Sequence, residues 1–128
     1  MNLLISNSSD LPIYEQIKRQ IIKEIANQNL ASNEILPSVR SLAKDLQISV
    51  LTVKKAYDAL EEAGYIKTVQ GKGSYVSAKN LELIKEEQLK MIEYHLLEAI
   101  QIAKLANISR NEIGEVFDYL YEEEEHEK

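Results

Sequence analysis

The chain has 128 residues, a formal net charge of −6 and no cysteine. A chain of this length forms one domain, or one domain with an appendage. Without cysteine it has no disulfide framework, no cysteine-ligated metal cluster and no thiol nucleophile. No apolar run reaches the length of a membrane-spanning helix, and the first residues lack the basic start and long apolar segment of a signal peptide. These features predict a cytoplasmic protein with no membrane partner.

The acidic charge is concentrated in the second half of the chain. Residues 1–78 contain nine Lys and Arg against eight Asp and Glu, whereas residues 79–128 contain six against thirteen. A nucleic-acid-binding surface needs a local basic patch and not a basic protein, so the net charge does not exclude such a surface in the first half. Glycine also nearly vanishes after residue 80. These shifts predict two domains, residues 1–78 and residues 79–128.

The first predicted helix follows a short lead. Residues 3–5 form either a small strand or a flexible end, and both alternatives stay open. Asp10 is the predicted N-cap, with Pro12 in the first turn of a helix that ends near Gln28. The apolar face of this helix is formed by Ile13, Ile17, Ile21 and Ile25, and its polar face carries Lys18, Arg19 and Lys23. We expect these three cations to be mainly solvated.

Residues 36–64 predict two helices joined by a tight turn. Ser38 and Ser49 are the expected N-caps, since a serine hydroxyl accepts a bond from a free N–H of the first turn. Gly64 ends the second helix, because glycine adopts the left-handed conformation without strain. The apolar faces comprise Val39, Leu42, Ala43 and Leu46 in the first helix, and Val53, Ala56, Tyr57, Leu60 and Ala63 in the second. A helix-turn-helix of this kind places its second helix in the DNA major groove.

A β-hairpin is predicted directly after these helices. Residues 65–69 and 74–76 have strand composition, and the turn between them contains Gly71, Lys72 and Gly73. The glycines allow close approach of the backbone to a duplex, and Lys72 can enter the minor groove or neutralise a phosphate. A nucleotide-binding loop is excluded, because no helix follows the glycines. Helix-turn-helix and β-hairpin together predict a winged helix.

The residues of this stretch fall at the spacing of a known family. The matching positions are Leu36, Pro37, Ser38, Arg40, Leu42, Ala43, Leu46, Ser49, Thr52, Val53, Ala56, Leu60, Glu61, Gly64, Gly71, Gly73, Tyr75 and Val76. They resemble the DNA-binding domain of GntR-type bacterial transcription regulators, and with the preceding helix they cover about the first three-fifths of the chain. The helical remainder resembles the YtrA-like branch, whose members lack a large effector domain. The resemblance implies a homodimeric repressor on an inverted-repeat operator, with a transporter operon as a candidate target.

Eleven residues are predicted to bind double-stranded DNA. The resemblance implies a DNA contact for Arg40; Lys54 suits polar contacts and Lys55 a phosphate. Family members commonly carry arginine or a small polar residue where this chain has Val50 and Leu51. These two side chains either contact thymine methyl groups or make a small contact with the wing or first helix. The full set is Ser38, Arg40, Ser49, Val50, Leu51, Thr52, Lys54, Lys55, Gly71, Lys72 and Gly73.

The second half predicts a helical hairpin. A long helix starts after Asn80 and stops near Asn107, and a capping box at residues 109–112 opens another helix. Residues 122–128 are acidic and expected to fray. A pair of helices in so small a chain cannot bury its apolar side chains, which predicts a symmetric dimer. The expected dimerisation residues are Ile84, Met91, Leu96, Ile102, Val116, Phe117 and Leu120.

The predicted fold class is mainly α with a small β-hairpin: an N-terminal winged helix-turn-helix and a C-terminal two-helix dimerisation hairpin. The leading function is a sequence-specific transcriptional regulator, and the alternative is a winged-helix module for protein–protein contact. An enzyme is not expected, since no nucleophile–base pair or phosphate loop can be assembled. His95 and His126 do not provide the three or four ligands of a metal site, so neither metal nor cofactor is predicted. The sequence does not identify a small-molecule effector.

Overall fold

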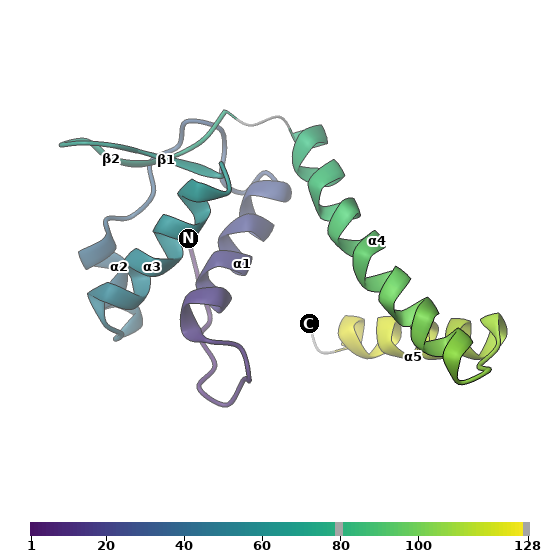
Figure 1. Ribbon diagram of the computed structural model, residues 1–128. Helices are drawn as coiled ribbons and strands as arrows, with labels where there is room; N and C mark the ends of the chain where they lie inside the picture. The colour runs from purple at the N-terminus through teal and green to yellow at the C-terminus, as the bar shows by residue number, and fades with distance from the viewer. Residues whose placement is uncertain (79–80, 127–128) are drawn as a thin grey trace. The chain divides into compact units, whose positions relative to one another are not determined.

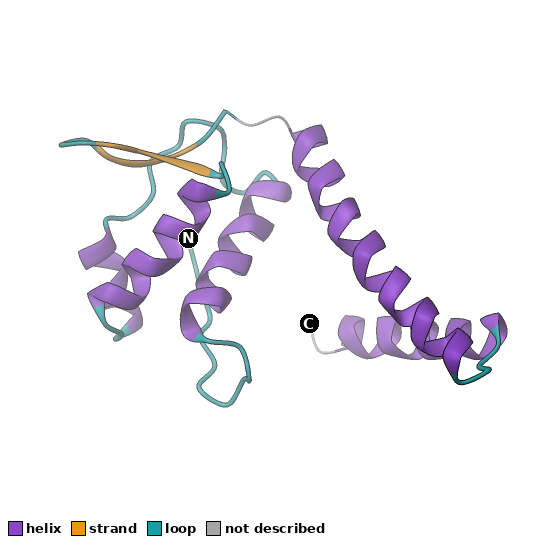
Figure 2. Cartoon of the chain, in the orientation of Figure 1, coloured by secondary structure: helices purple, strands orange, loops and turns teal. Residues whose placement is uncertain are grey.

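The computed structural model describes residues 1–78 and 81–126. Within them lie five helices and one antiparallel two-stranded sheet (Figures 1 and 2). In chain order the elements are α1 (Ile13–Ala26), α2 (Val39–Leu46), α3 (Val50–Glu62), β1 (Ile66–Val69), β2 (Gly73–Val76), α4 (Leu81–Leu105) and α5 (Arg110–His126). The predicted class, mainly α with a small β-hairpin, is confirmed. None of the described helices is long and apolar enough to cross a membrane.

The chain divides into two compact units, Met1–Lys85 and Glu86–Lys128. In the first unit, α1 and α2 both pack on α3, and β1 follows α3 onto the same core. The side chains that are most completely buried come from α1, α3 and β2, and are Ile17, Ile21, Val53, Leu60 and Val76. The first turn of α4 belongs to this unit, because Ile84 is buried in its core. The unit therefore extends beyond residue 78.

The segment before α1 is neither a strand nor a loose end. Leu3 is buried, and the backbone on either side of Ile5 is held by two side-chain amides of α1. Gln20 accepts a hydrogen bond from the Leu4 N–H at 2.9 Å and donates one to the Leu4 carbonyl at 2.6 Å. Gln16 does the same with Ser6, at 2.8 and 2.9 Å. We call this segment, residues 3–6, the N-terminal arm.

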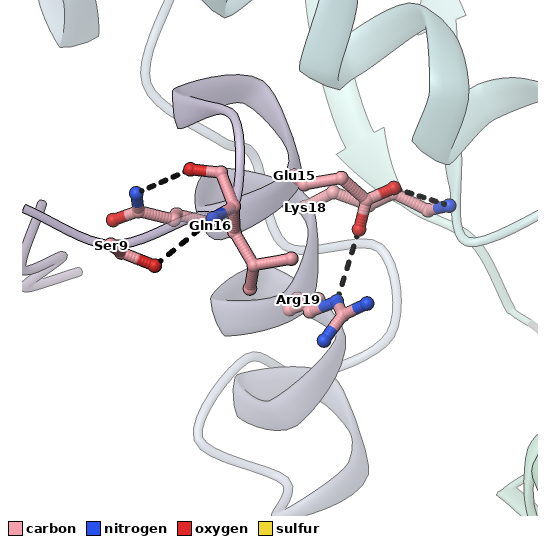
Figure 3. A network of polar contacts seen from close by, with 6 residues as sticks. Ser9, Glu15, Gln16, Lys18 and Arg19 are labelled. Atoms are coloured by element: carbon pink, nitrogen blue, oxygen red, sulfur yellow. Dashed lines mark hydrogen bonds and ion pairs between the residues drawn. The ribbon is translucent and has the colours of Figure 1, made fainter. Parts of the chain in front are cut away.

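The prediction that Asp10 caps α1 is wrong. Pro12 occupies the N-cap position and no side chain caps the helix. The Gln16 amide donates to the Leu11 carbonyl at 3.0 Å, and the Leu11 N–H donates to the Ser9 hydroxyl at 3.1 Å (Figure 3). These bonds draw the chain in close to α1, and the extended Pro12 delays the first helical residue to Ile13.

The caps predicted for α2 and α3 are confirmed. The Ser38 hydroxyl accepts a hydrogen bond from the Ser41 N–H, and the Ser49 hydroxyl from the Thr52 N–H, each at 3.1 Å. Gln47 takes the left-handed conformation between the helices, with φ 57°. Gly64 has φ 85° just after α3, in the conformation that glycine adopts without strain. Local sequence therefore sets both starts and the end of the helix-turn-helix.

The β-hairpin gains support from a third segment of backbone. β1 and β2 pair in the register Ile66↔Val76 to Val69↔Gly73. On the other edge of β2, the Leu36 N–H donates to the Ser74 carbonyl and the Val76 N–H to the Glu34 carbonyl, each at 2.8 Å. The loop before α2 thus anchors the wing to the helix-turn-helix.

In the second unit, α4 and α5 are joined by a short turn. Asn107 has a φ of 59°, and the Ile108 N–H donates to the Ala103 carbonyl at 2.8 Å. The Glu112 N–H donates to the Ser109 hydroxyl at 3.2 Å, which caps α5 as predicted. The expected cap Asn80 and residues 127–128 lie outside the described residues. Residues 122–126, where fraying is predicted, are helical in α5, and glutamate is a good helix former.

The two helices of this unit do not pack along one another. Among the described elements, the helix pairs that pack closely are α1 with α3 and α2 with α3. Apolar side chains consequently remain at the surface of both α4 and α5. The exposed set includes Leu89, Met91, Ile92, Leu96, Leu97, Ile100, Ile102, Leu105, Val116, Phe117 and Leu120.

Candidate nucleic-acid interface

The residues predicted to bind DNA lie on three elements of the first unit. Arg40 is in the first turn of α2, and Lys72 is at the turn of the β-hairpin. Five of the predicted side chains belong to α3, between Val50 and Lys55, and Ser49 is the N-cap of that helix. In Figure 1 the tip of the β-hairpin extends beyond α2 and α3, away from α1. All eleven predicted residues are exposed except Thr52, which is half-buried.

The polar groups at the start of α3 are engaged with each other. The Ser49 hydroxyl accepts the Thr52 N–H and also lies 2.7 Å from the Thr52 hydroxyl. These contacts satisfy the cap of the helix. The side chains of the first turn that make no such bond are aliphatic: Val50, 43% exposed, and Leu51, 77% exposed.

The cations differ in how they are held. Lys54 Nζ lies 2.9 Å from Asp58 Oδ2, one turn later on the exposed face of α3. An exposed pair of this kind contributes about 0–1 kcal/mol, so a phosphate can replace the carboxylate. Arg40 and Lys72 form no ion pair with any residue that the structure describes. Their charges are available to a ligand.

Lys55 is oriented by α1. Its Nζ lies 4.1 Å from the centroid of the Tyr14 ring, a cation–π contact between α3 and α1. Within α1, the Glu15 carboxylate lies 3.6 Å from Lys18 Nζ and 3.0 Å from Arg19 Nε (Figure 3). Two cations expected to be solvated are therefore partly neutralised by Glu15. Sequence reasoning missed the role of Tyr14, since nothing local in the sequence links it to Lys55.

The wing is tied to the end of α3 by a carboxylate. Glu61 Oε2 accepts a hydrogen bond from the Thr68 N–H at 2.7 Å, on the edge of β1. The Thr68 hydroxyl lies 3.1 Å from that of Ser74 across the hairpin, and the Tyr75 hydroxyl donates to the Lys72 carbonyl at 3.2 Å. These bonds fix the approach to the turn, where Gly71 has φ 79°. Sequence reasoning did not identify these supporting contacts.

Tyr57 joins the core to the start of α2. As predicted, its ring is buried. Its hydroxyl donates a hydrogen bond to the Pro37 carbonyl at 2.7 Å, and burial raises the pKa of Tyr57 to about 12. The bond holds the backbone directly before Ser38 and Arg40 against α3.

The residues expected to mediate dimerisation fall into two groups. Ile84 is 3% exposed within the core of the first unit, so its side chain is already covered by its own chain and cannot contribute to a dimer surface. The other six are between 45% and 66% exposed on α4 and α5: Met91, Leu96, Ile102, Val116, Phe117 and Leu120. Within residues 1–78 and 81–126, no group of three or more His, Asp or Glu side chains could hold a metal ion.

The first unit combines three features: a capped helix with an exposed first turn, a preceding helix that carries an arginine outside any ion pair, and a β-hairpin with a lysine at its tip. Together they define the winged-helix class of DNA-binding proteins. The family described as "Bacterial regulatory proteins, gntR family" matches residues 13–76. The chain therefore belongs to the GntR family. It is a transcription regulator with a DNA-binding domain and not an enzyme.

The chain is similar to individual members of this family over most of its length. It is 34% identical to the HTH-type transcriptional repressor YtrA of Bacillus subtilis (strain 168), covering 87% of this chain and 85% of that protein. The structure of YtrA from Sulfolobus acidocaldarius, a GntR-family transcription factor, is 38% identical with a TM-score of 0.63, over 75% of this chain and 97% of that one. The structure of the DNA-binding domain of AraR in complex with operator ORX1 is 26% identical with a TM-score of 0.54, over 60% of this chain and 96% of that one.

Proposed function

We propose that this protein is a repressor that binds an inverted-repeat operator as a homodimer. Residues 1–78 would bind DNA and residues 79–128 would form the dimer. The single observation that carries the proposal is the combination, in one chain, of an exposed first turn on α3 with the uncovered apolar side chains of α4 and α5. A repressor named YtrA and the operator complex of the AraR domain support the same assignment.

The dimer follows from what the second unit leaves uncovered. Burying a large aliphatic or aromatic side chain is worth about 1.5–3 kcal/mol. Each protomer has six such groups, the exposed residues among the predicted dimerisation set. The free energy gained by burying them exceeds the free-energy cost of association even if only part of their surface becomes buried. A helix that is apolar on several faces, such as α4, is typical of a helix buried in an assembly.

Two-fold symmetry would then determine the form of the operator. Each protomer presents one α3, so a symmetric dimer reads the same sequence twice, as an inverted repeat. The half-sites are expected about one helical turn of DNA apart, on the order of 34 Å. The excess of acidic residues after residue 79 repels phosphate and keeps the dimerisation part off the DNA.

Two measurements test this function. The affinity for an operator selected from random DNA should fall steeply with salt, because bound cations release counterions from the duplex. Sedimentation at micromolar concentration should give a dimer. A monomer that still binds its operator tightly would overturn the homodimer, and no salt-sensitive binding to any selected DNA would favour the protein–protein module.

The regulated genes are proposed from resemblance alone. The YtrA-like resemblance implies a transporter operon, and a DNA-binding regulator of this class acts in the cytoplasm. Mapping the protein's binding sites on its genome tests the operon: sites that lie away from every transporter gene would overturn it.

A further inference from the structure

Two adjacent aliphatic side chains occupy the position from which a winged helix reads bases. Val50 and Leu51 form the first turn of α3, and Leu51 is 77% exposed. By contrast, the four α3 side chains that face the core, Val53, Ala56, Tyr57 and Leu60, are buried. The first turn thus carries apolar surface on the side of α3 that faces away from the core.

An intramolecular role does not account for these side chains. A small contact with the wing or with the first helix would cover Leu51, yet three-quarters of it remains open in the part of the chain that the structure describes. Val50 is 43% exposed, and neither residue belongs to the hydrophobic core cluster or to the side chains packed against it.

The polar groups of the same turn are already committed. Ser49 and Thr52 share a hydrogen bond of 2.7 Å between their hydroxyls, and Ser49 also accepts the Thr52 N–H. Each polar side chain of this turn is therefore part of the helix cap. A ligand can therefore contact the aliphatic side chains of the first turn without breaking the helix cap.

We propose that Leu51, supported by Val50, binds the 5-methyl group of a pyrimidine in the DNA major groove. This inference rests on the proposed operator binding and specifies how one position of each half-site is read. Among the four bases, thymine alone places a methyl group in the major groove, and an apolar side chain is the group that contacts it. Leu51 would bind the methyl carbon and not the neighbouring oxygen.

A reader of methyl groups has a distinctive preference. Leucine cannot distinguish the thymine O4 acceptor from the cytosine N4 donor, since it forms no hydrogen bond with either. The site should therefore prefer thymine to uracil and, at the same position, 5-methylcytosine to cytosine. A residue that reads by hydrogen bonds would instead show little sensitivity to the methyl group.

The test uses the full-length protein and DNA selected by it from a random pool. Each thymine of the selected half-site is replaced in turn by uracil, and the position that responds is then tested as cytosine and 5-methylcytosine. We expect each lost methyl group to lower the affinity about fourfold, the factor that corresponds to one buried CH₂ group at about 0.8 kcal/mol. Leu51→Ala should bind the thymine and uracil duplexes with nearly equal affinity.

Leu4→Ala is the matched control, because Leu4 is 83% exposed in the N-terminal arm, outside the set predicted to bind DNA. This variant should keep the full preference for thymine. Tight binding with indifference to uracil at every position would overturn the inference and leave operator binding intact. If no DNA is selected at all, the proposed function itself fails.

Discussion

The Tyr57 hydroxyl donates a hydrogen bond to the Pro37 carbonyl at 2.7 Å, across twenty residues of sequence. Tyr57 is part of α3, and Pro37 precedes the cap of α2. The bond joins the element that reads DNA to the backbone that presents Arg40. A residue buried as part of the core therefore also sets the position of a surface arginine.

Replacing Tyr57 with phenylalanine should weaken the fold and the interface together. The variant keeps the buried ring and leaves the Pro37 carbonyl without its donor, which costs about 0.5–1.5 kcal/mol. We expect that loss in urea unfolding at pH 8, and weaker operator binding because the start of α2 is less firmly held. An unchanged unfolding midpoint would show that water replaces the phenol without cost.

The same variant should alter the dependence of stability on pH. Burial raises the pKa of Tyr57 to about 12 in the folded protein, from about 10 in an unfolded chain. The neutral phenol is the form that the fold favours, so its contribution is complete below pH 10 and is lost as the pH rises through 12. The difference in stability between wild type and Tyr57→Phe should therefore shrink between pH 10 and pH 12. A constant difference would contradict the shifted pKa.

Glu61 should control the wing without affecting the helices. Its carboxylate accepts the Thr68 N–H at 2.7 Å, so Glu61→Ala leaves the edge of β1 without this anchor. We expect lower operator affinity and faster amide exchange at Thr68, with unchanged helical circular dichroism. Glu61→Gln retains an acceptor oxygen and should bind nearly as wild type. If Glu61→Ala and Glu61→Gln have the same operator affinity and the same rate of amide exchange at Thr68, the hydrogen bond does not position the wing.

Asp58 should restrain DNA binding. It lies 2.9 Å from Lys54 on an exposed face of α3, where it competes with phosphate for the ammonium group. Asp58→Asn should increase operator affinity several-fold at low salt and change the free energy of unfolding by less than about 1 kcal/mol, the usual value of an exposed pair.

Lys54→Ala and Arg40→Ala should each weaken operator binding by about 1–3 kcal/mol if they reach bases. A gel-shift series over salt concentration checks all three, and weaker binding by Asp58→Asn would contradict the competition.

Phe117 should be central to the proposed dimer. Phe117 is 52% exposed on α5, and the centroid of its ring lies 5.6 Å from that of Tyr121. Phe117→Glu would place a charge in the interface and should shift the sedimenting species to monomer, since an unpaired buried charge is costly. Phe117→Leu keeps an apolar side chain and should remain dimeric. An unchanged dimer for Phe117→Glu would place the interface elsewhere.

Local chemistry explains which parts of the fold the sequence could predict. The caps at Ser38, Ser49 and Ser109 and the left-handed Gly64 depend on neighbours within three or four residues, so their patterns are readable directly. The β-hairpin and the family resemblance were likewise predictable from patterns of residues that lie close together in the sequence. The candidate interface was predictable as a set of positions for this reason.

Contacts between distant segments were not predictable in this way. Asp10 is a residue type favoured at the N-cap, yet Gln16 engages the carbonyl of Leu11 and the helix begins later. Lys55 on Tyr14 and Glu61 on Thr68 likewise depend on tertiary position. Ile84 belonged by periodicity to the apolar face of α4, and only the packing of the first unit shows that its own chain covers it.

The two glutamines that hold the N-terminal arm match a helix to an extended chain by length. Gln16 and Gln20 are four residues apart, a rise of about 6 Å along α1. They hold Ser6 and Leu4, which are two residues apart, a separation of about 6.7 Å in extended backbone. The two spacings agree over one step and diverge by about 0.7 Å with each further step. The mismatch accumulates along the segment, so pairing of this kind suits a short antiparallel arm. The pitch of α1 thus limits the docked length of the arm, and one residue inserted beside Ile5 would put the two glutamines out of step with the backbone they hold.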